Sequence, residues 1–241
     1  MGQDHKRNLR VDFLQKSFDD VKTQMLTQYN YNPSSKEVKI FASLHKRIFC
    51  LCSLIYELSK SDKERMLFLT ELHSDLILLL IVGPLRIKKA ISLAIRSSIE
   101  DTLRHVYYKD HPIELSLLNE SDDNRMTDKE FFKYVEIHPL YRDRSSFNKL
   151  LHSVHNIYHT HSKQLHSASL SYFSSLKVIS DISGNSDILE ESIKDIVSLS
   201  SALLTIIIIF HSKEFRKMSF DKRKLFLSCL KNEHKKIIHD L

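Results

Sequence analysis

The chain has 241 residues, with only three glycines, four prolines and three cysteines. Sheet-rich folds need more turn residues than this, so the composition excludes them and predicts an all-α protein, a single multi-helix bundle over residues 1–241. The formal net charge is +6, and residues 211–241 hold nine Lys and Arg against four Asp and Glu, which leaves the rest of the chain almost neutral.

The N-terminal half of the chain is predicted to form four helices. The first spans about 8–28, where apolar residues recur at helical spacing. The second and third, over 34–59 and 61–83, each begin with Ser-x-x-Glu, the capping-box pattern. The fourth, over 84–109, begins with proline, whose missing N–H costs nothing in a first turn.

The C-terminal half is predicted to contain a polar connection over 114–125 and then four more helices. A Thr-x-x-Glu capping box opens a short helix over 127–137, and a histidine-rich helix covers 150–172. Helix 187–211 follows, and a last helix over 219–239 carries a basic face. That face is either a solvated surface or a contact for phosphate or an acidic partner. The bundle core is expected within about 35–211.

Two apolar runs, Leu76–Val82 and Ala202–Phe210, are too short for the roughly 20 residues of a membrane span. We therefore expect both to be buried in a soluble domain, with no membrane partner. The N-terminus lacks the apolar core of a signal peptide, so a cytoplasmic location is expected. The three cysteines have no zinc-type spacing, which predicts free thiols and no metal site. No cofactor is expected either, since the sequence contains no Gly-rich phosphate loop.

The predicted helix over 150–172 holds five of the fourteen histidines. An apolar stripe runs along one side of it: Phe147, Leu150, Leu151, Val154, Tyr158, Leu165 and Tyr172. Four histidines share a second face: His152, His155, His159 and His166. The fifth, His161, falls on the apolar stripe.

Three interpretations of the histidine face remain open. His155 and His159 are i, i+4 neighbours, as in helices that bind zinc, although nothing marks further ligands. Alternatively, the histidines are polar residues on a partly exposed face or at a helix interface. The third interpretation is acid–base chemistry on a polyanion, because the pKa of histidine lies near neutrality.

A charged pattern stands out in helix 84–109. Arg96, Glu100 and Arg104 are spaced i, i+4 and i+8, which places one carboxylate between two guanidinium groups. Such a ladder on a surface contributes only a few tenths of a kcal/mol per pair. The alternatives are a buried pair that sets the helix register and an arginine held ready for phosphate by its glutamate.

Two short motifs give the chain a family resemblance. Arg96-Ser-Ser-Ile-Glu100 and Ser162-Lys-Gln-Leu-His166 resemble the R-x-x-x-E and hydroxyl-x-x-x-His patterns of the HEPN superfamily of small helical bundles. The resemblance covers roughly 40–210 and implies a HEPN-like core with extra N- and C-terminal helices. Many members resemble toxin or antiviral-defence ribonucleases that act as dimers around RNA.

The resemblance implies an RNA-targeting homodimer, a metal-independent endoribonuclease of a bacterial toxin or antiviral-defence system. Five residues are then expected to carry catalysis: Arg96, Glu100, His159, Ser162 and His166. In this family the ribose 2′-hydroxyl attacks the phosphate; His166 would be the acid or base, and Arg96 would stabilise the phosphate charge.

The chain departs from the usual catalytic signature of that family, R-x(4–6)-H in one helix, because positions 159, 160 and 161 are His, Thr and His. Either Arg96 or Lys163 supplies the cation, or the site does not cleave. The alternative function is a non-catalytic helical interaction or accessory protein that binds a partner protein or nucleic acid. Convergence of Arg96 and His166 in the fold would favour the ribonuclease over the interaction protein.

Overall fold

A computed structural model describes residues 2–29, 33–60, 66–120, 126–140, 145–166 and 186–239. All regular structure in these ranges is helical, in eleven α-helices, which confirms the predicted all-α bundle. The helices are α1 (Gly2–Tyr29), α2 (Ser35–Ser59), α3 (Leu67–Val82), α4 (Lys88–Asp110), α5 (Pro112–Glu120), α6 (Asp128–Ile137), α7 (Ser145–Leu165), α8 (Ser186–Phe210), α9 (Ser212–Lys217), α10 (Phe220–Ser228) and α11 (Asn232–His239).

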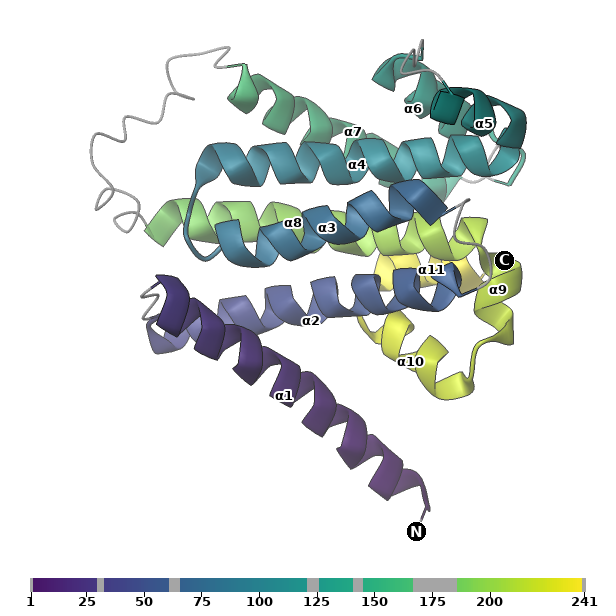
Figure 1. Cartoon of the computed structure of the whole chain (residues 1–241). Helices are drawn as coiled ribbons and strands as arrows, with labels where there is room; N and C mark the ends of the chain where they lie inside the picture. The colour runs from purple at the N-terminus through teal and green to yellow at the C-terminus, as the bar shows by residue number, and fades with distance from the viewer. Residues whose placement is uncertain are drawn as a thin grey trace.

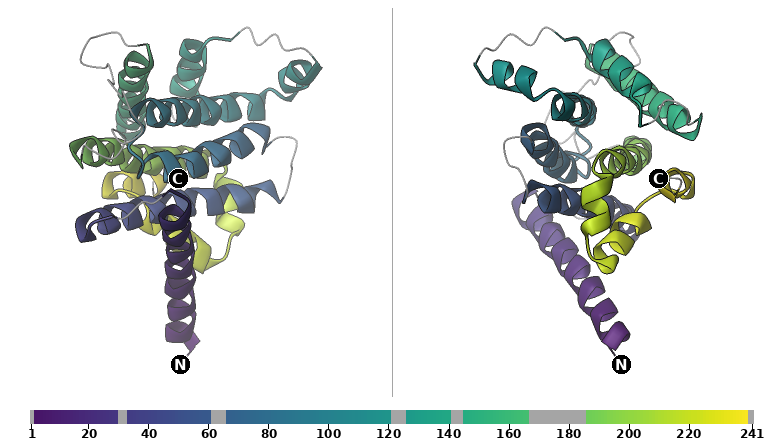
Figure 2. Two further views of the ribbon diagram at one scale, coloured as in Figure 1. Left: turned by 60° about the vertical axis from the view of Figure 1, so that its left-hand side comes forward. Right: turned by 90° about the vertical axis from the view of Figure 1, so that its right-hand side faces the viewer.

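Helices α4 and α8 form the centre of the bundle (Figure 1). Helix α4 packs against α3, α6, α7 and α8, while α8 also contacts α2 and α11. Helix α1 contacts α2 and extends away from the other helices, so that the N-terminus lies far from α6 and α7 (Figure 2). The site residues therefore lie on the side of the bundle opposite α1.

The apolar residues predicted on α4 form its buried face. These are Ile91, Ala94, Ile95, Ile99, Leu103, Val106 and Tyr107. The stripe predicted on α7 is buried too where the structure describes it, over Phe147, Leu150, Leu151, Val154 and Tyr158, whereas Leu165 is half-buried and Tyr172 lies outside the described residues. Removal of such large apolar side chains from water is the main stabilising contribution to the bundle.

The apolar run Ala202–Phe210 is completely buried within α8. Among the described residues, one helix is long and apolar enough to cross a membrane, over Ile193–Phe210, and 78% of that window is buried inside the fold. This burial is the pattern of a core helix in a soluble protein. The run Leu76–Val82 is less deeply buried than expected, because Ile77 and Leu78 are exposed on α3.

Two of the three predicted capping boxes are present. The backbone N–H of Ser34 donates to Glu37 Oε2 at 2.8 Å, and the Ser34 side chain accepts from the Glu37 N–H. At the start of α6, the Thr127 N–H donates to Glu130 Oε2 at 2.7 Å. These bonds satisfy backbone donors that a helix start leaves unpaired. The predicted box at Ser61 lies outside the described residues.

Helix α4 begins four residues later than predicted. Pro84 lies in a turn over 83–87, and Lys88 is the first residue of the helix. The turn contains Arg86 at a φ of 61°, a conformation rarely adopted by residues other than glycine. An ion pair between Arg86 and Glu37 of α2 accompanies this conformation. A tertiary contact thus displaces the helix start from the position that the proline favours locally.

Two further predictions of chain organisation were wrong. Residues 112–120 form α5 instead of the start of a polar connection, with Pro112 at the first helical position, which suits proline. The last predicted helix is divided into α10 and α11. The break arises because the Lys231 N–H donates to Ser201 Oγ of α8 at 2.9 Å, which turns the chain back onto the core.

A buried pair of histidines joins α4 to the end of α8. The Nε2 atoms of His105 and His211 lie 2.8 Å apart, and both side chains are fully buried. One imidazole must donate and the other accept, so at least the accepting ring must be neutral. Burial lowers the pKa of both residues, and the positive charge of the neighbouring Lys109 lowers it further. The pKa of His211 falls to about 4.

The histidine pair predicts a loss of stability in mild acid. Because the folded pKa of His211 lies below its unfolded value of about 6.5, the unfolded state binds more protons as the pH falls. From pH 7 to pH 5, His211 alone should reduce the free energy of unfolding by about 2 kcal/mol. Urea denaturation at both pH values measures this change. A variant carrying His105→Phe and His211→Phe should lose that part of the decline; an unchanged decline would contradict the prediction.

Candidate functional site

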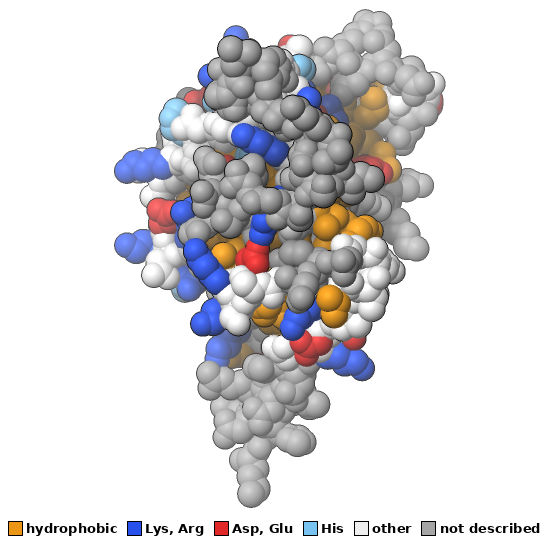
Figure 3. Space-filling model, turned by 90° about the vertical axis from the view of Figure 1, so that its left-hand side faces the viewer, with side chains coloured by type: hydrophobic (Ala, Val, Ile, Leu, Met, Phe, Trp, Pro, Cys, Tyr) orange, Lys and Arg blue, Asp and Glu red, His pale blue; other side chains and the backbone are white. Residues whose placement is uncertain are grey.

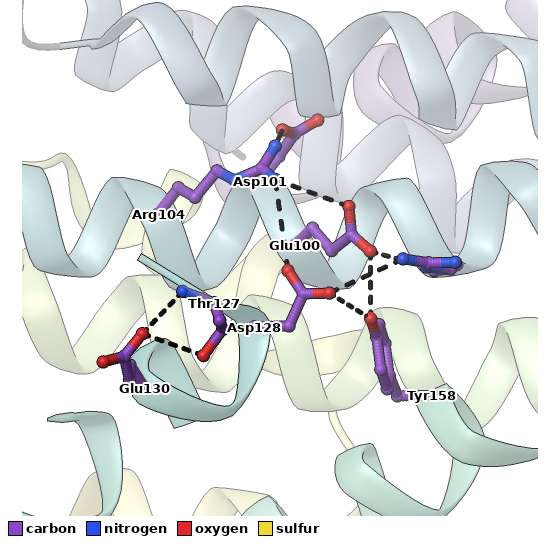
Figure 4. Close-up of polar contacts among 8 residues, drawn as sticks. Glu100, Asp101, Arg104, Thr127, Asp128, Glu130 and Tyr158 are labelled. Carbon is purple, nitrogen blue, oxygen red and sulfur yellow. Dashed lines mark hydrogen bonds and ion pairs between the residues drawn. The ribbon is translucent and has the colours of Figure 1, made fainter. Parts of the chain in front are cut away.

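Arg96 of α4 is held between two carboxylates. Its Nε donates to Glu100 Oε1 at 2.6 Å, one turn along the same helix, as the i, i+4 spacing predicted. Its Nη2 lies 3.5 Å from Asp128 Oδ2, at the first residue of α6. The capping box between Thr127 and Glu130 fixes this start of α6 and thereby the position of Asp128 (Figure 4). Two of the three guanidinium nitrogens are therefore fixed.

Tyr158 of α7 closes the network from the opposite side. Its hydroxyl lies 2.5 Å from Asp128 Oδ2 and 3.1 Å from Glu100 Oε1, and Figure 4 shows these three side chains converging. The tyrosine ring also lies 5.5 Å from the guanidinium carbon of Arg96. Burial, and after it the hydrogen bond to Asp128, raises the pKa of Tyr158, so the hydroxyl stays protonated and available to donate.

Arg104 forms the outer side of the same network. Its Nη2 lies 3.7 Å from Glu100 Oε2 and 4.0 Å from Asp128 Oδ1, and its Nη1 lies 3.9 Å from Asp101 Oδ1. Burial, followed by the repulsion of Asp75, raises the pKa of Asp101 to about 7. The two arginines therefore face three carboxylates, and Asp101 among them is partly protonated near neutrality.

His166 at the end of α7 faces the remaining nitrogen of Arg96. Arg96 Nη1 lies 3.5 Å from His166 Nε2, although the two residues are 70 positions apart in the chain. The structure thus brings together Arg96, Glu100 and His166, three of the five residues predicted to form the site. Burial opposes the charge of Arg96, but Glu100 outweighs it and raises the pKa above the ordinary value, so the guanidinium stays charged.

The other two predicted residues stand apart from this network. His159 is exposed on α7, where its ring lies 4.3 Å from that of His155. Ser162 Oγ is buried and has no hydrogen-bond partner within the described ranges. The His166 N–H donates to the backbone carbonyl of Ser162 at 3.1 Å, but among the described residues no side-chain hydrogen bond or ion pair joins His159 or Ser162 to Arg96 or His166. Nor do the described residues include a group of three His, Cys, Asp or Glu side chains that could hold a metal ion.

His161 lies in the core, as its place on the apolar stripe predicted. Only 2% of its surface is exposed, and its Nδ1 lies 3.0 Å from Ser92 Oγ of α4. The Ser92 hydroxyl donates to Gln164 Oε1 at 2.6 Å, so it accepts from His161. The other ring nitrogen of His161 lies 3.4 Å from Asp195 Oδ2 of α8. His161 thus links α7 to both central helices.

We expect His161→Ala to reduce the free energy of unfolding by about 2–3 kcal/mol, because it opens a cavity and removes a buried hydrogen bond. His159→Ala, two residues earlier on the exposed face, is the control and should change stability by less than about 0.5 kcal/mol. Chemical denaturation of both variants measures the difference. Equal losses in the two variants would show that His161 is not the core residue described here.

Two residues of the network were not predicted as site residues. Asp128 is an unmarked position inside the Thr-x-x-Glu capping box, and Tyr158 was predicted only as part of the core stripe. Their role depends on the crossing of α4, α6 and α7, which no local pattern in the sequence reveals. The capping box before Asp128 was the nearest signal, since it places an acidic residue in a first helical turn.

No protein-family model, curated protein or solved structure matches the chain.

Proposed function

We propose that the protein is a HEPN-like, RNA-targeting protein that cleaves RNA without a metal ion, as a homodimer in the bacterial cytoplasm, in toxin or antiviral defence. The observation that carries this proposal is the approach of Arg96 Nη1 to His166 Nε2 at 3.5 Å. A charged guanidinium beside an exposed imidazole combines a phosphate-binding group with a proton carrier. The resemblance to HEPN proteins supplies the substrate class and the dimer.

The proposed reaction is attack of a ribose 2′-hydroxyl on the adjacent phosphate. The new bond joins the 2′-oxygen to phosphorus, the bond from phosphorus to the 5′-oxygen breaks, and the products are a 2′,3′-cyclic phosphate and a 5′-hydroxyl. His166 takes the proton from the 2′-hydroxyl or gives one to the 5′-oxygen. Arg96 stabilises the additional negative charge on the phosphate oxygens.

The surrounding carboxylates act on Arg96 in this proposal and do not touch the substrate. Glu100 and Asp128 bind Nε and Nη2, so that Nη1 is directed at His166. His159, exposed two turns before His166 on the same face, is the candidate for a second proton carrier. The buried hydroxyl of Ser162 is assigned no step.

The formal net charge of the chain, +6, agrees with a polyanionic substrate. Figure 3 shows Lys and Arg side chains, in blue, spread over the described part of one face, with Asp and Glu side chains, in red, among them. Positive surface charge attracts nucleic acid independently of its sequence.

Incubation of the purified protein with total RNA, in the presence and absence of EDTA, tests the proposal. We expect the RNA to be shortened equally in both samples. RNA that stays intact, or that is cut only when EDTA is omitted, would contradict metal-independent cleavage.

A second candidate is a non-catalytic interaction or accessory protein that binds a partner protein or nucleic acid. One observation favours it: Glu100 and Asp128 neutralise Arg96, as in ion-pair networks that only set the packing of helices. The same incubation discriminates the candidates, because an interaction protein leaves RNA intact.

A further inference from the structure

A groove of about 410 Å³ lies between α6 and α7, next to the network of Arg96. Lys129 and Lys133 line it from α6, and His152 and His155 line it from α7. Glu136 is the single carboxylate among its lining residues. The groove is therefore positively charged even with both histidines neutral.

The two lysines of the groove are exposed and form no ion pair within the described part of the chain. Residues 129 and 133 are four positions apart, about one helical turn, so their side chains project from the same face of α6 at a separation of about 6 Å along the axis. Two ammonium groups in a row, without carboxylate partners, favour a ligand with more than one negative charge.

The groove lies beside the site described above, although no residue of the Arg96 network is among the residues that line it. Lys129 directly follows Asp128, the carboxylate that binds Arg96, and His155 lies one turn before Tyr158. The ring of Phe132 connects the two regions: its centroid lies 4.9 Å from that of His155 and 5.6 Å from that of Tyr158. The same two helices therefore form the walls of the groove and hold part of the network.

We propose that the groove between α6 and α7 binds the backbone of a single RNA strand whose next segment reaches Arg96 and His166. This inference rests on the proposed function and names the path of its substrate. Lys129 and Lys133 bind successive phosphates, while His152 and His155 offer ring faces and N–H donors to the adjacent nucleotides. The lysine contacts are to the backbone and a ring face accepts any base, so binding is independent of sequence.

The test measures the binding of a fluorescently labelled 12-nucleotide RNA to the full chain. Binding is monitored by fluorescence anisotropy in a buffer that contains EDTA. His166→Ala is included in every protein, so that the RNA stays intact. The groove variant carries Lys129→Gln and Lys133→Gln. Its matched control carries Lys16→Gln and Lys39→Gln, two exposed lysines of α1 and α2 on the opposite side of the bundle (Figures 1 and 2).

We expect the groove variant to bind at least roughly tenfold more weakly at about 0.1 M salt, and the control to stay within about twofold. A plot of log affinity against log salt concentration has a negative slope, and its magnitude should be smaller by about 1.4 in the groove variant. Each of the two lost phosphate contacts accounts for about 0.7 of this change. Equal binding by the groove variant and the control would overturn the proposal. So would an absence of RNA binding accompanied by lysine-dependent binding of polyglutamate, which would assign the groove to an acidic protein partner.

Cleavage of the same RNA by the protein with His166 intact separates this proposal from the proposed function. Binding that depends on the two lysines, without cleavage, would support the groove and contradict catalysis. Cleavage at a rate that the two lysine substitutions leave unchanged, measured at limiting RNA, would support catalysis and contradict the groove.

Discussion

Substitution of His166 by alanine is expected to abolish RNA cleavage and to leave the fold intact. Loss of a general acid or base reduces the rate typically 10²- to 10⁴-fold. The side chain is exposed at the end of α7, so its removal should change the free energy of unfolding by less than about 0.5 kcal/mol.

The measurement is the initial rate of RNA cleavage at equal concentrations of folded protein, verified by circular dichroism. His239→Ala, an exposed histidine of α11, is the control and should cleave at the rate of the unmodified protein. Full activity in His166→Ala would refute its role in catalysis and would leave the interaction protein as the better candidate.

Arg96→Ala is expected to reduce both cleavage and stability. Cleavage should fall at least roughly 100-fold, because the phosphate charge loses its partner. The free energy of unfolding should fall by about 1–3 kcal/mol, because Glu100 and Asp128 are left close together without the guanidinium. The arginine is 27% exposed, so solvent screening keeps this loss below that of a fully buried ion pair.

A second variant separates the two effects of Arg96. Arg96→Gln combined with Asp128→Asn removes one carboxylate together with the cation, and should recover most of the lost stability while cleavage stays lost. Cleavage restored together with stability would show that Arg96 acts only through packing. Thermal unfolding and cleavage rates on the same samples measure both quantities.

The bundle could be predicted in large part because its signals are local. Helical spacing of apolar residues identified the buried faces of α4 and α7, and the capping boxes at Ser34 and Thr127 identified two helix starts. The late start of α4 and the break before α11 were missed, since contacts with distant residues, Glu37 and Ser201, override the local pattern there.

The site was predictable to the extent that it depends on spacing within one helix. The i, i+4 pair of Arg96 and Glu100 could be read directly from the sequence. The approach of His166 was expected only from the family resemblance, because it depends on how α7 crosses α4. Asp128 and Tyr158 were missed for the same physical reason: a carboxylate and a phenol on two other helices meet only after the helices pack.

The most direct test of the central claim compares two oligonucleotides of one sequence, incubated with the unmodified protein in EDTA. One is RNA, and the other carries a 2′-O-methyl group on every ribose, which removes the attacking hydroxyl. We predict that only the RNA is cut and that its fragments end in 2′,3′-cyclic phosphate. Equal cleavage of both oligonucleotides, or RNA left intact, would contradict the assignment of Arg96 and His166 as a metal-independent ribonuclease site.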